Sequence, residues 1–415
     1  MTNIYIWLIS FLAIAGVIVR PFKIPEVAWA LSGAVILLIF GLITLGGAAA
    51  GVGKGLDVYL FLTGMMLLAE TAREEKLFDW LAAHATRMAK GSPKRLFFLI
   101  YLVGVVVTSF LSNDATAVVL TPAVAAAVKA AKVDKPLPYL FICAFIANAA
   151  SFVLPISNPA NLVIYGKHMP SLLTWMSHYL IPSVVSIVVT YLILFATQRK
   201  DIEGKVATDV TIPKLSTGGK TALVGIGITA VVLLISSALD IELGLPTAIT
   251  GILTSIIVII IAHKNPVTII KGVSWAVLPL VAGLFVIVEA LNQTGITQKL
   301  AQLLQHHAAQ NPTATAWGSG IITAFACNLM NNLPAGLIAG NVIQGGHVPE
   351  LVKSATLIGI DLGPNLSMTG SLATILWLVA LRREGQEVTA WQFLKVGAVV
   401  MTITLVFVLA SLWIL

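Results

Sequence analysis

Residues 110–122, FLSNDATAVVLTP, and residues 330–334, MNNLP, decide the fold, because each sets polar groups inside a long apolar stretch. The sequence on either side predicts two helical arms, with Asn113-Asp114 at the first tip and Asn331-Asn332 at the second. Lys and Arg residues flank the outer ends of the first pair of arms. Polar backbone and side chains at this depth are tolerated only where protein or a polar cavity surrounds them. We therefore interpret both segments as hairpins whose tips lie inside a membrane.

The composition supports a membrane protein. Of the 415 residues 58% are apolar and 10% are charged, whereas soluble proteins carry about 25% charged residues. Long apolar blocks such as Ile4–Val19 and Leu172–Ala196 approach the roughly 20 residues that a spanning helix needs. The first block is interpreted as a span and not as a removed signal peptide. The net charge of +7 is explained by orientation in the membrane, so no nucleic-acid partner is predicted.

Polar landmarks recur in the same order in the two halves of the chain. The offset drifts only from 219 residues to 213 between the first and last landmarks. The matched pairs are Glu70 with Glu289, Asn113 with Asn331, Asn148 with Asp361, and Asn158 with Ser371. Internal repeats of this kind are typical of transporters.

The basic residues predict how the halves are oriented. With five crossings per half, the second copy is inverted, and all but four of the 25 Lys and Arg residues fall on one side. The exceptions are Lys54, Lys167, Lys299 and Lys353. By the positive-inside rule, the side with more Lys and Arg residues is cytoplasmic. The first tip then enters from the cytoplasm and the second from outside.

The predicted fold class is an all-α polytopic membrane protein of two inverted-topology repeats, with about ten spanning helices, two re-entrant helical hairpins and two broken helices. The first repeat covers 1–197, with its hairpin at 95–128 and its broken helix at 137–166. A cytoplasmic linker covers 198–220. The second repeat covers 221–415, with its hairpin at 314–344 and its broken helix at 354–380. The breaks are predicted from Pro155, Pro159 and Pro364, because proline removes a backbone donor and clashes with the preceding turn.

Neutral donors and acceptors gather at the tips and breaks, and we predict that they bind the substrate. No Arg or Lys lies in these segments, which disfavours a clamp for a carboxylate or phosphate and favours a small neutral, hydroxylated solute. Some of these residues are expected only to join helices. The candidates are Asn113, Thr116, Asn148, Ser157, Asn158, Asn161, Asn331, Asn332, Asn365, Thr369, Gly370, Ser371 and Thr374.

Two aspartates, Asp114 and Asp361, lie deep in apolar segments. A charge at the bilayer centre costs roughly 3 kcal/mol, so we interpret both as proton or ion carriers, the alternative being structural carboxylates. Glu70 and Glu289 each stand at the end of a predicted spanning helix, and both are interpreted as anchors at the membrane interface.

Other reactive residues predict no catalytic or metal site. Cys143 and Cys327 lie in apolar segments and are interpreted as small apolar fillers, while His306 and His307 are interpreted as surface residues. The glycine-rich stretch at 51–56 lacks the spacing of a phosphate-binding loop. We therefore expect no cofactor, no metal and no enzyme activity.

The segments around the tips resemble the ArsB arsenite efflux pumps of the ion transporter superfamily. The residues that carry the resemblance are 110–122, 330–334 and above all 361–377, DLGPNLSMTGSLATILW. It covers essentially the whole chain. It implies export of arsenite and antimonite in exchange for protons across the inner (plasma) membrane, by a scaffold part and a moving part. It also implies an ArsA-type ATPase as a cytoplasmic partner in some members.

Arsenite at neutral pH is mostly an uncharged trihydroxide, which agrees with the neutral lining. One departure is Asn148, where the family carries an aspartate, and this leaves Asp114 and Asp361 as the stronger proton carriers. The alternatives are a sodium/proton antiporter or carboxylate carrier of the same superfamily, and a passive metalloid channel. An intramembrane enzyme is disfavoured, because no nucleophile and base are paired at membrane depth.

Overall fold

The computed structural model describes residues 2–166, 169–204, 206–208 and 210–414, and all regular structure in these ranges is helical. Lys167 and Lys205, two of the basic residues used to orient the chain, lie outside the described residues. The first half contains α1 (Thr2–Val19), α2 (Glu26–Ile39), α3 (Leu45–Lys54), α4 (Leu56–Glu74), α5 (Leu77–Met88), α6 (Pro93–Phe110), α7 (Asn113–Ala115), α8 (Thr121–Ala130), α9 (Leu137–Ala149), α10 (Pro159–Tyr165) and α11 (Leu172–Gln198).

The second half is also helical. It contains α12 (Thr217–Ala238), α13 (Gly244–Ala262), α14 (Pro266–Gly272), α15 (Val277–Gln293), α16 (Ile296–Gln310), α17 (Pro312–Met330), α18 (Asn332–Gly346), α19 (Glu350–Leu362), α20 (Leu372–Arg383) and α21 (Ala390–Ser411). Because α12 begins at Thr217, the end of the predicted linker is already helical.

The helices are long and apolar enough for a multi-pass membrane protein. Among the described residues seven helices could cross a bilayer, or eight when α3 and α4 are taken as one span bent by 47°. Helices α2 and α9 are apolar but shorter. Large apolar side chains are exposed along the outer helices, for example Ile260, Ile322 and Phe407, where lipid replaces water as the solvent.

Glycines allow the helices of one side of the molecule to pack closely. Helix α4 packs on α13, and α15 packs on α2. Gly64 of α4 lies so close to α13 that a Cβ atom there would meet the Thr247 carbonyl, and Gly251 approaches Gly64 in the same way. Small residues at such contacts are the usual means of helix association in membranes, because apolar side chains gain little by leaving lipid.

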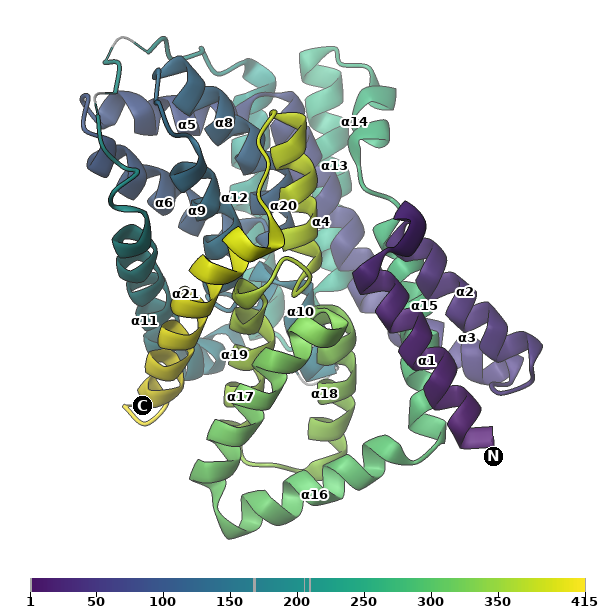
Figure 1. Cartoon of the computed structure of the whole chain (residues 1–415). Coiled ribbons are helices and arrows are strands. Elements are labelled where there is room, and N and C mark those ends of the chain that lie inside the picture. The colour runs from purple at the N-terminus through teal and green to yellow at the C-terminus, as the bar shows by residue number, and fades with distance from the viewer. Residues whose placement is uncertain (1, 167–168, 205, 209, 415) are drawn as a thin grey trace.

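The two hairpins reach into the molecule from opposite faces. Figure 1 shows α17 and α18 extending inward from the face that carries α16 and both termini, whereas α5, α14 and the outer end of α20 lie at the opposite face. The broken helix of each half packs on the hairpin of the other, α10 against α18 and α20 against residues 116–120. The tips and breaks therefore converge at the centre.

Candidate functional site

At the first hairpin tip the chain leaves α6 at Phe110 and enters a new helix at Asn113. Ser112 caps it by accepting a hydrogen bond from the Ala115 N–H at 3.3 Å, and the Asn113 Oδ1 atom accepts from the Asp114 N–H at 2.9 Å. Residues 116–120 then form a π-helical turn, a distortion that is frequent at functional sites. Thr116 shares a 2.8 Å hydroxyl hydrogen bond with Thr108 of the other arm. The Asp114 carboxylate forms no hydrogen bond or ion pair with the described residues.

The second tip is attached to the break between α19 and α20. Asn331 has a φ of 71°, a left-handed value that Asn adopts more readily than most residues. The Asn332 N–H donates to the Gly370 carbonyl at 2.8 Å, and the Asn331 side chain reaches the Thr369 carbonyl at 3.4 Å. Asn331, Thr369 and Gly370 are therefore engaged in holding the tip.

Sequence reasoning missed Asn328, one turn before the second tip. Its side-chain amide donates to the Gly363 carbonyl at 3.0 Å, and its oxygen accepts from the Ser367 hydroxyl at 2.6 Å. The signal was an amide among apolar residues, as at the predicted positions. The hydrogen bonds of Asn328 to the second break are seen only in the structure.

The two breaks are joined by a buried bond between an amide and a carboxylate. The Asn158 Nδ2 atom donates to the Asp361 Oδ1 atom at 2.7 Å, and Asn158 Oδ1 caps α10 by accepting from the Ala160 N–H at 3.0 Å. Asp361 is fully buried, and its Oδ2 atom has no hydrogen-bond partner among the described residues. The predicted carrier Asp361 thus lies in contact with a predicted binding residue.

A second buried group lies behind this pair and joins the helices. Asn148 donates to Asn365 Oδ1 at 3.0 Å and to the Thr374 hydroxyl at 3.4 Å. Ser371 caps α20 and shares a 2.9 Å hydrogen bond with Thr374.

Two further predicted residues bond to the chain next to the first break. The Asn161 amide donates to the Ser151 carbonyl at 2.9 Å, and the Ser157 hydroxyl donates to the Ser109 carbonyl at 3.0 Å. These residues satisfy backbone groups freed by the break, as buried polar groups must.

A small cavity of about 20 Å³ brings four of the predicted residues together. They are Asn113 and Asp114 from the first tip, Asn158 from the first break and Asn332 from the second tip. Neither Arg nor Lys lines it, and apolar walls come from Leu62, Val277 and Val281 of the α4–α15 side. A space of this size holds about one water molecule. In this conformation the tips and the first break therefore meet at a space for about one water molecule, which four polar side chains and no Arg or Lys line.

A cavity lies toward each face of this centre, and each is lined by one of the paired glutamates. Toward the α5 face, about 50 Å³ is lined by Asp114 and Glu70, whose carboxylate accepts from the Arg73 Nε atom at 2.8 Å. Toward the α16 face, a vestibule of about 680 Å³ is lined by Glu289, which forms a 2.6 Å ion pair with Lys54. The larger of these two cavities lies toward the α16 face, whereas the smaller one shares lining residues, including Asp114, with the central cavity.

The remaining predicted residues lie off the centre. Cys143 and Cys327 are both fully buried and line neither the 20 Å³ cavity nor the two cavities beside it. His306 and His307 are exposed on α16. Within the described ranges no group of His, Cys, Asp and Glu side chains has the arrangement of a metal site.

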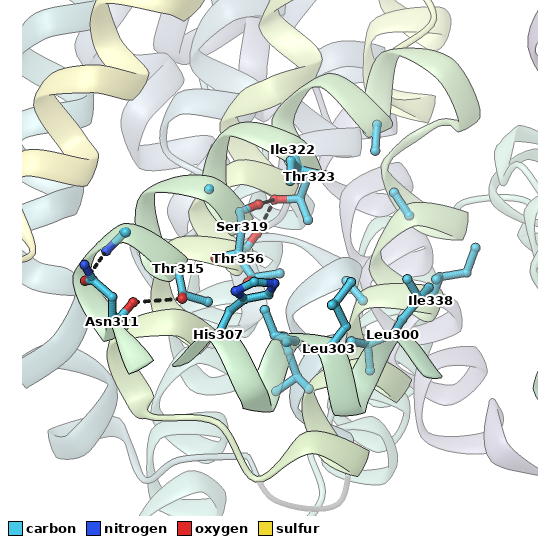
Figure 2. Close-up of a pocket in the computed structure, with 18 of the residues that line it drawn as sticks. Leu300, Leu303, His307, Asn311, Thr315, Ser319, Ile322, Thr323, Ile338 and Thr356 are labelled. Atoms are coloured by element: carbon cyan, nitrogen blue, oxygen red, sulfur yellow. Dashed lines mark hydrogen bonds between the residues drawn. The ribbon is translucent and has the colours of Figure 1, made fainter. Parts of the chain in front are cut away.

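Another cavity, of about 510 Å³, lies between α16 and the second hairpin (Figure 2). Its walls are mostly apolar, with Leu300 and Leu303 of α16 facing the hairpin residues Ile322 and Ile338, although polar side chains such as His307 also line it. None of the predicted binding residues lines it, so the polar centre described above is the better candidate for a hydroxylated solute.

Comparisons with known proteins agree on the class of protein. The family model described as "Citrate transporter", CitMHS, matches residues 11–354. An arsenical pump membrane protein of Escherichia coli is 29% identical over 412 residues, which is 96% of this chain and 96% of that protein. One from Yersinia enterocolitica is 30% identical over 348 residues, covering 81% of this chain and 80% of its own length.

The fold has a solved counterpart. The crystal structure of the Alcanivorax borkumensis YdaH transporter superposes with a TM-score of 0.60, covering 100% of this chain and 98% of that one at 14% identity. At this identity the likeness concerns the fold alone.

Proposed function

Because this chain belongs to the citrate transporter family CitMHS and is a relative of the arsenical pump membrane proteins, we propose that it exports trivalent arsenite and antimonite as neutral hydroxides in exchange for protons. The observation that carries the proposal is the central cavity, where three amides and one aspartate from both tips and the first break meet without a cation. Amides can donate to and accept from the hydroxyl groups of such a solute at once. An anionic substrate would lack a countercharge there.

The two aspartates would move the protons. Asp114 lines both the central cavity and the cavity beside Glu70, so it is placed to exchange a proton for the substrate. Asp361 would act through Asn158, which contacts both the carboxylate and the cavity. A carboxylate that is neutral in one step and ionised in the next changes the charge of the site, and this couples occupancy to proton movement.

We further propose that the halves are inverted repeats and that the α5 face is cytoplasmic. The opposite directions of the two hairpins (Figure 1) and the matched packing of α4 on α13 and α15 on α2 support this proposal. The vestibule beside Glu289 would then be the route to the outside, and an ArsA-type ATPase would approach the α5 face. The wall of α4, α13, α2 and α15 would be the scaffold.

A carboxylate carrier is the second candidate, favoured by the description of the family model. The basic residue at the vestibule, Lys54, is already paired with Glu289, and the central cavity has none. The test is a substrate panel in everted membrane vesicles with an acid interior: arsenite, antimonite, sodium, succinate and citrate. We expect uptake of arsenite and antimonite only. Sodium-stimulated citrate or succinate uptake without arsenite uptake would overturn the proposal.

A further inference from the structure

A buried row of hydroxyl groups, separate from the substrate cavities, runs from the α16 face toward Asp361. It begins at Glu350, the first residue of α19, whose side chain is 34% exposed. The Tyr165 hydroxyl of α10 donates to the Glu350 Oε1 atom at 2.8 Å. The Tyr179 hydroxyl of α11 lies 2.7 Å from the Tyr165 hydroxyl. Tyr165 is 6% exposed and Tyr179 is fully buried.

The directions of these hydrogen bonds form a continuous chain. A hydroxyl group has one proton to donate, and Tyr165 gives its proton to Glu350, so Tyr179 must donate to Tyr165. The ring of Trp175 lies 4.4 Å from that of Tyr179 and 5.7 Å from that of Tyr165. This aromatic wall, itself fully buried, encloses the two hydroxyls and keeps the row apart from lipid.

The inner end of the row lies beside α19, the helix that carries Asp361. Ser354 of this helix is buried and lies next to Tyr179. Ser354 and Asp361 are seven residues apart on α19, which places them on one face of the helix, two turns from each other. The Asp361 Oδ2 atom is buried without a partner among the described residues, so it has a free lone pair for an arriving proton.

We propose that Glu350, Tyr165 and Tyr179 form a proton relay between the outer face and Asp361, separate from the route of the substrate. This inference rests on the proposed proton exchange. The hydroxyls first rotate about their C–O bonds, so that Tyr165 donates to Tyr179 and Tyr179 donates to Ser354. A proton bound at Glu350 then passes to the Tyr165 oxygen while the Tyr165 proton passes to Tyr179, and the Tyr179 proton moves by way of Ser354 and water to Asp361. Each hydroxyl ends with one proton, directed toward Glu350 as in the structure. Neither tyrosine needs to ionise.

Among the described residues, Lys353 and His178 lie next to the row. Lys353 lies 3.2 Å from the Glu350 Oε2 atom, and His178 neighbours Tyr179 on α11, with ring centroids 6.4 Å apart. Because Glu350 is partly exposed at the α16 face, it can exchange a proton with water there.

The test uses Tyr165→Phe and Tyr179→Phe, which remove the hydroxyls and keep the packing of the rings. Tyr101→Phe is the matched control, because its buried hydroxyl donates at 2.7 Å to the Ile187 carbonyl, away from the row. Two rates are measured in everted vesicles: arsenite uptake driven by a pH gradient, and exchange of labelled for unlabelled arsenite without a gradient. Exchange moves no net proton.

We expect both relay variants to lose roughly a hundredfold in gradient-driven uptake, at the lower end of what a positioned proton-transfer group contributes. Exchange should stay at the parent rate, and Tyr101→Phe should keep both rates. Equal loss of uptake and exchange, or no loss of either, would overturn the relay. Absence of gradient-driven uptake in the parent protein would instead overturn the proposed function.

Discussion

Asn158→Ala tests how the polar centre is coupled to Asp361. The substitution removes a buried 2.7 Å hydrogen bond to the Asp361 carboxylate. Ser151 lies beside the same carboxylate. Its hydroxyl donates its proton to the Asn148 carbonyl at 2.7 Å, so Ser151 does not supply the hydrogen bond that Asp361 loses with the Asn158 amide. Hydrogen bonds to charged groups contribute about 1.5–3 kcal/mol.

If Asp361 must ionise in every cycle, the ionised state becomes less favourable by that amount. Since 1.36 kcal/mol corresponds to a factor of ten, we expect proton-driven arsenite uptake at saturating arsenite to fall by about 10- to 150-fold. The assay is the initial rate of uptake into everted vesicles with an acid interior, normalised to the amount of inserted protein.

Asn161→Ala is the matched control, because it removes a buried amide of the same break that donates only to backbone carbonyls of Ser151 and Pro155. We expect a smaller loss of uptake. If Asn161→Ala slows uptake as much as Asn158→Ala, the effect comes from loosening the break, and the reasoning about the carboxylate is refuted.

Three further predictions concern the carriers, the thiols and the scaffold. Asp114→Asn and Asp361→Asn should each abolish proton-driven arsenite uptake while the protein still inserts; full uptake by both variants would remove the proton-carrier role. Replacing Cys143 and Cys327 together by Ala should leave arsenite and antimonite resistance of cells unchanged, because both thiols lie off the cavities; loss of resistance to either would show a soft ligand for the metalloid. Gly64→Val should lower the amount of folded protein recovered from membranes, because its side chain would meet the Thr247 backbone, whereas Gly227→Val, with open space around it, should not; equal recovery would contradict the close packing.

The sequence predicted the features whose chemistry conflicts with their apolar surroundings. The two tips and two breaks stand out because Asn, Asp, Pro and Gly interrupt stretches that otherwise favour uninterrupted spans. The apolar composition likewise predicted a multi-pass helical protein, which the structure and the family confirm.

Other features depend on contacts between residues far apart in the chain. The sequence did not show that Asn148 and Asn365 bond to each other, 217 residues apart, while Asn113 and Asn332 line the cavity. Tyr165, Tyr179 and Glu350 were also missed. A tyrosine in an apolar helix is indistinguishable by pattern from one that packs in the core or at the membrane surface.

The most direct test of proton-coupled export is uphill accumulation of arsenite in everted vesicles containing the parent protein. With an acid interior, arsenite should accumulate above its external concentration and leave when a proton uncoupler is added. An antiporter requires this result, because the gradient is its only source of free energy. Equilibration without accumulation, or accumulation that survives the uncoupler, would contradict proton exchange as the driving force.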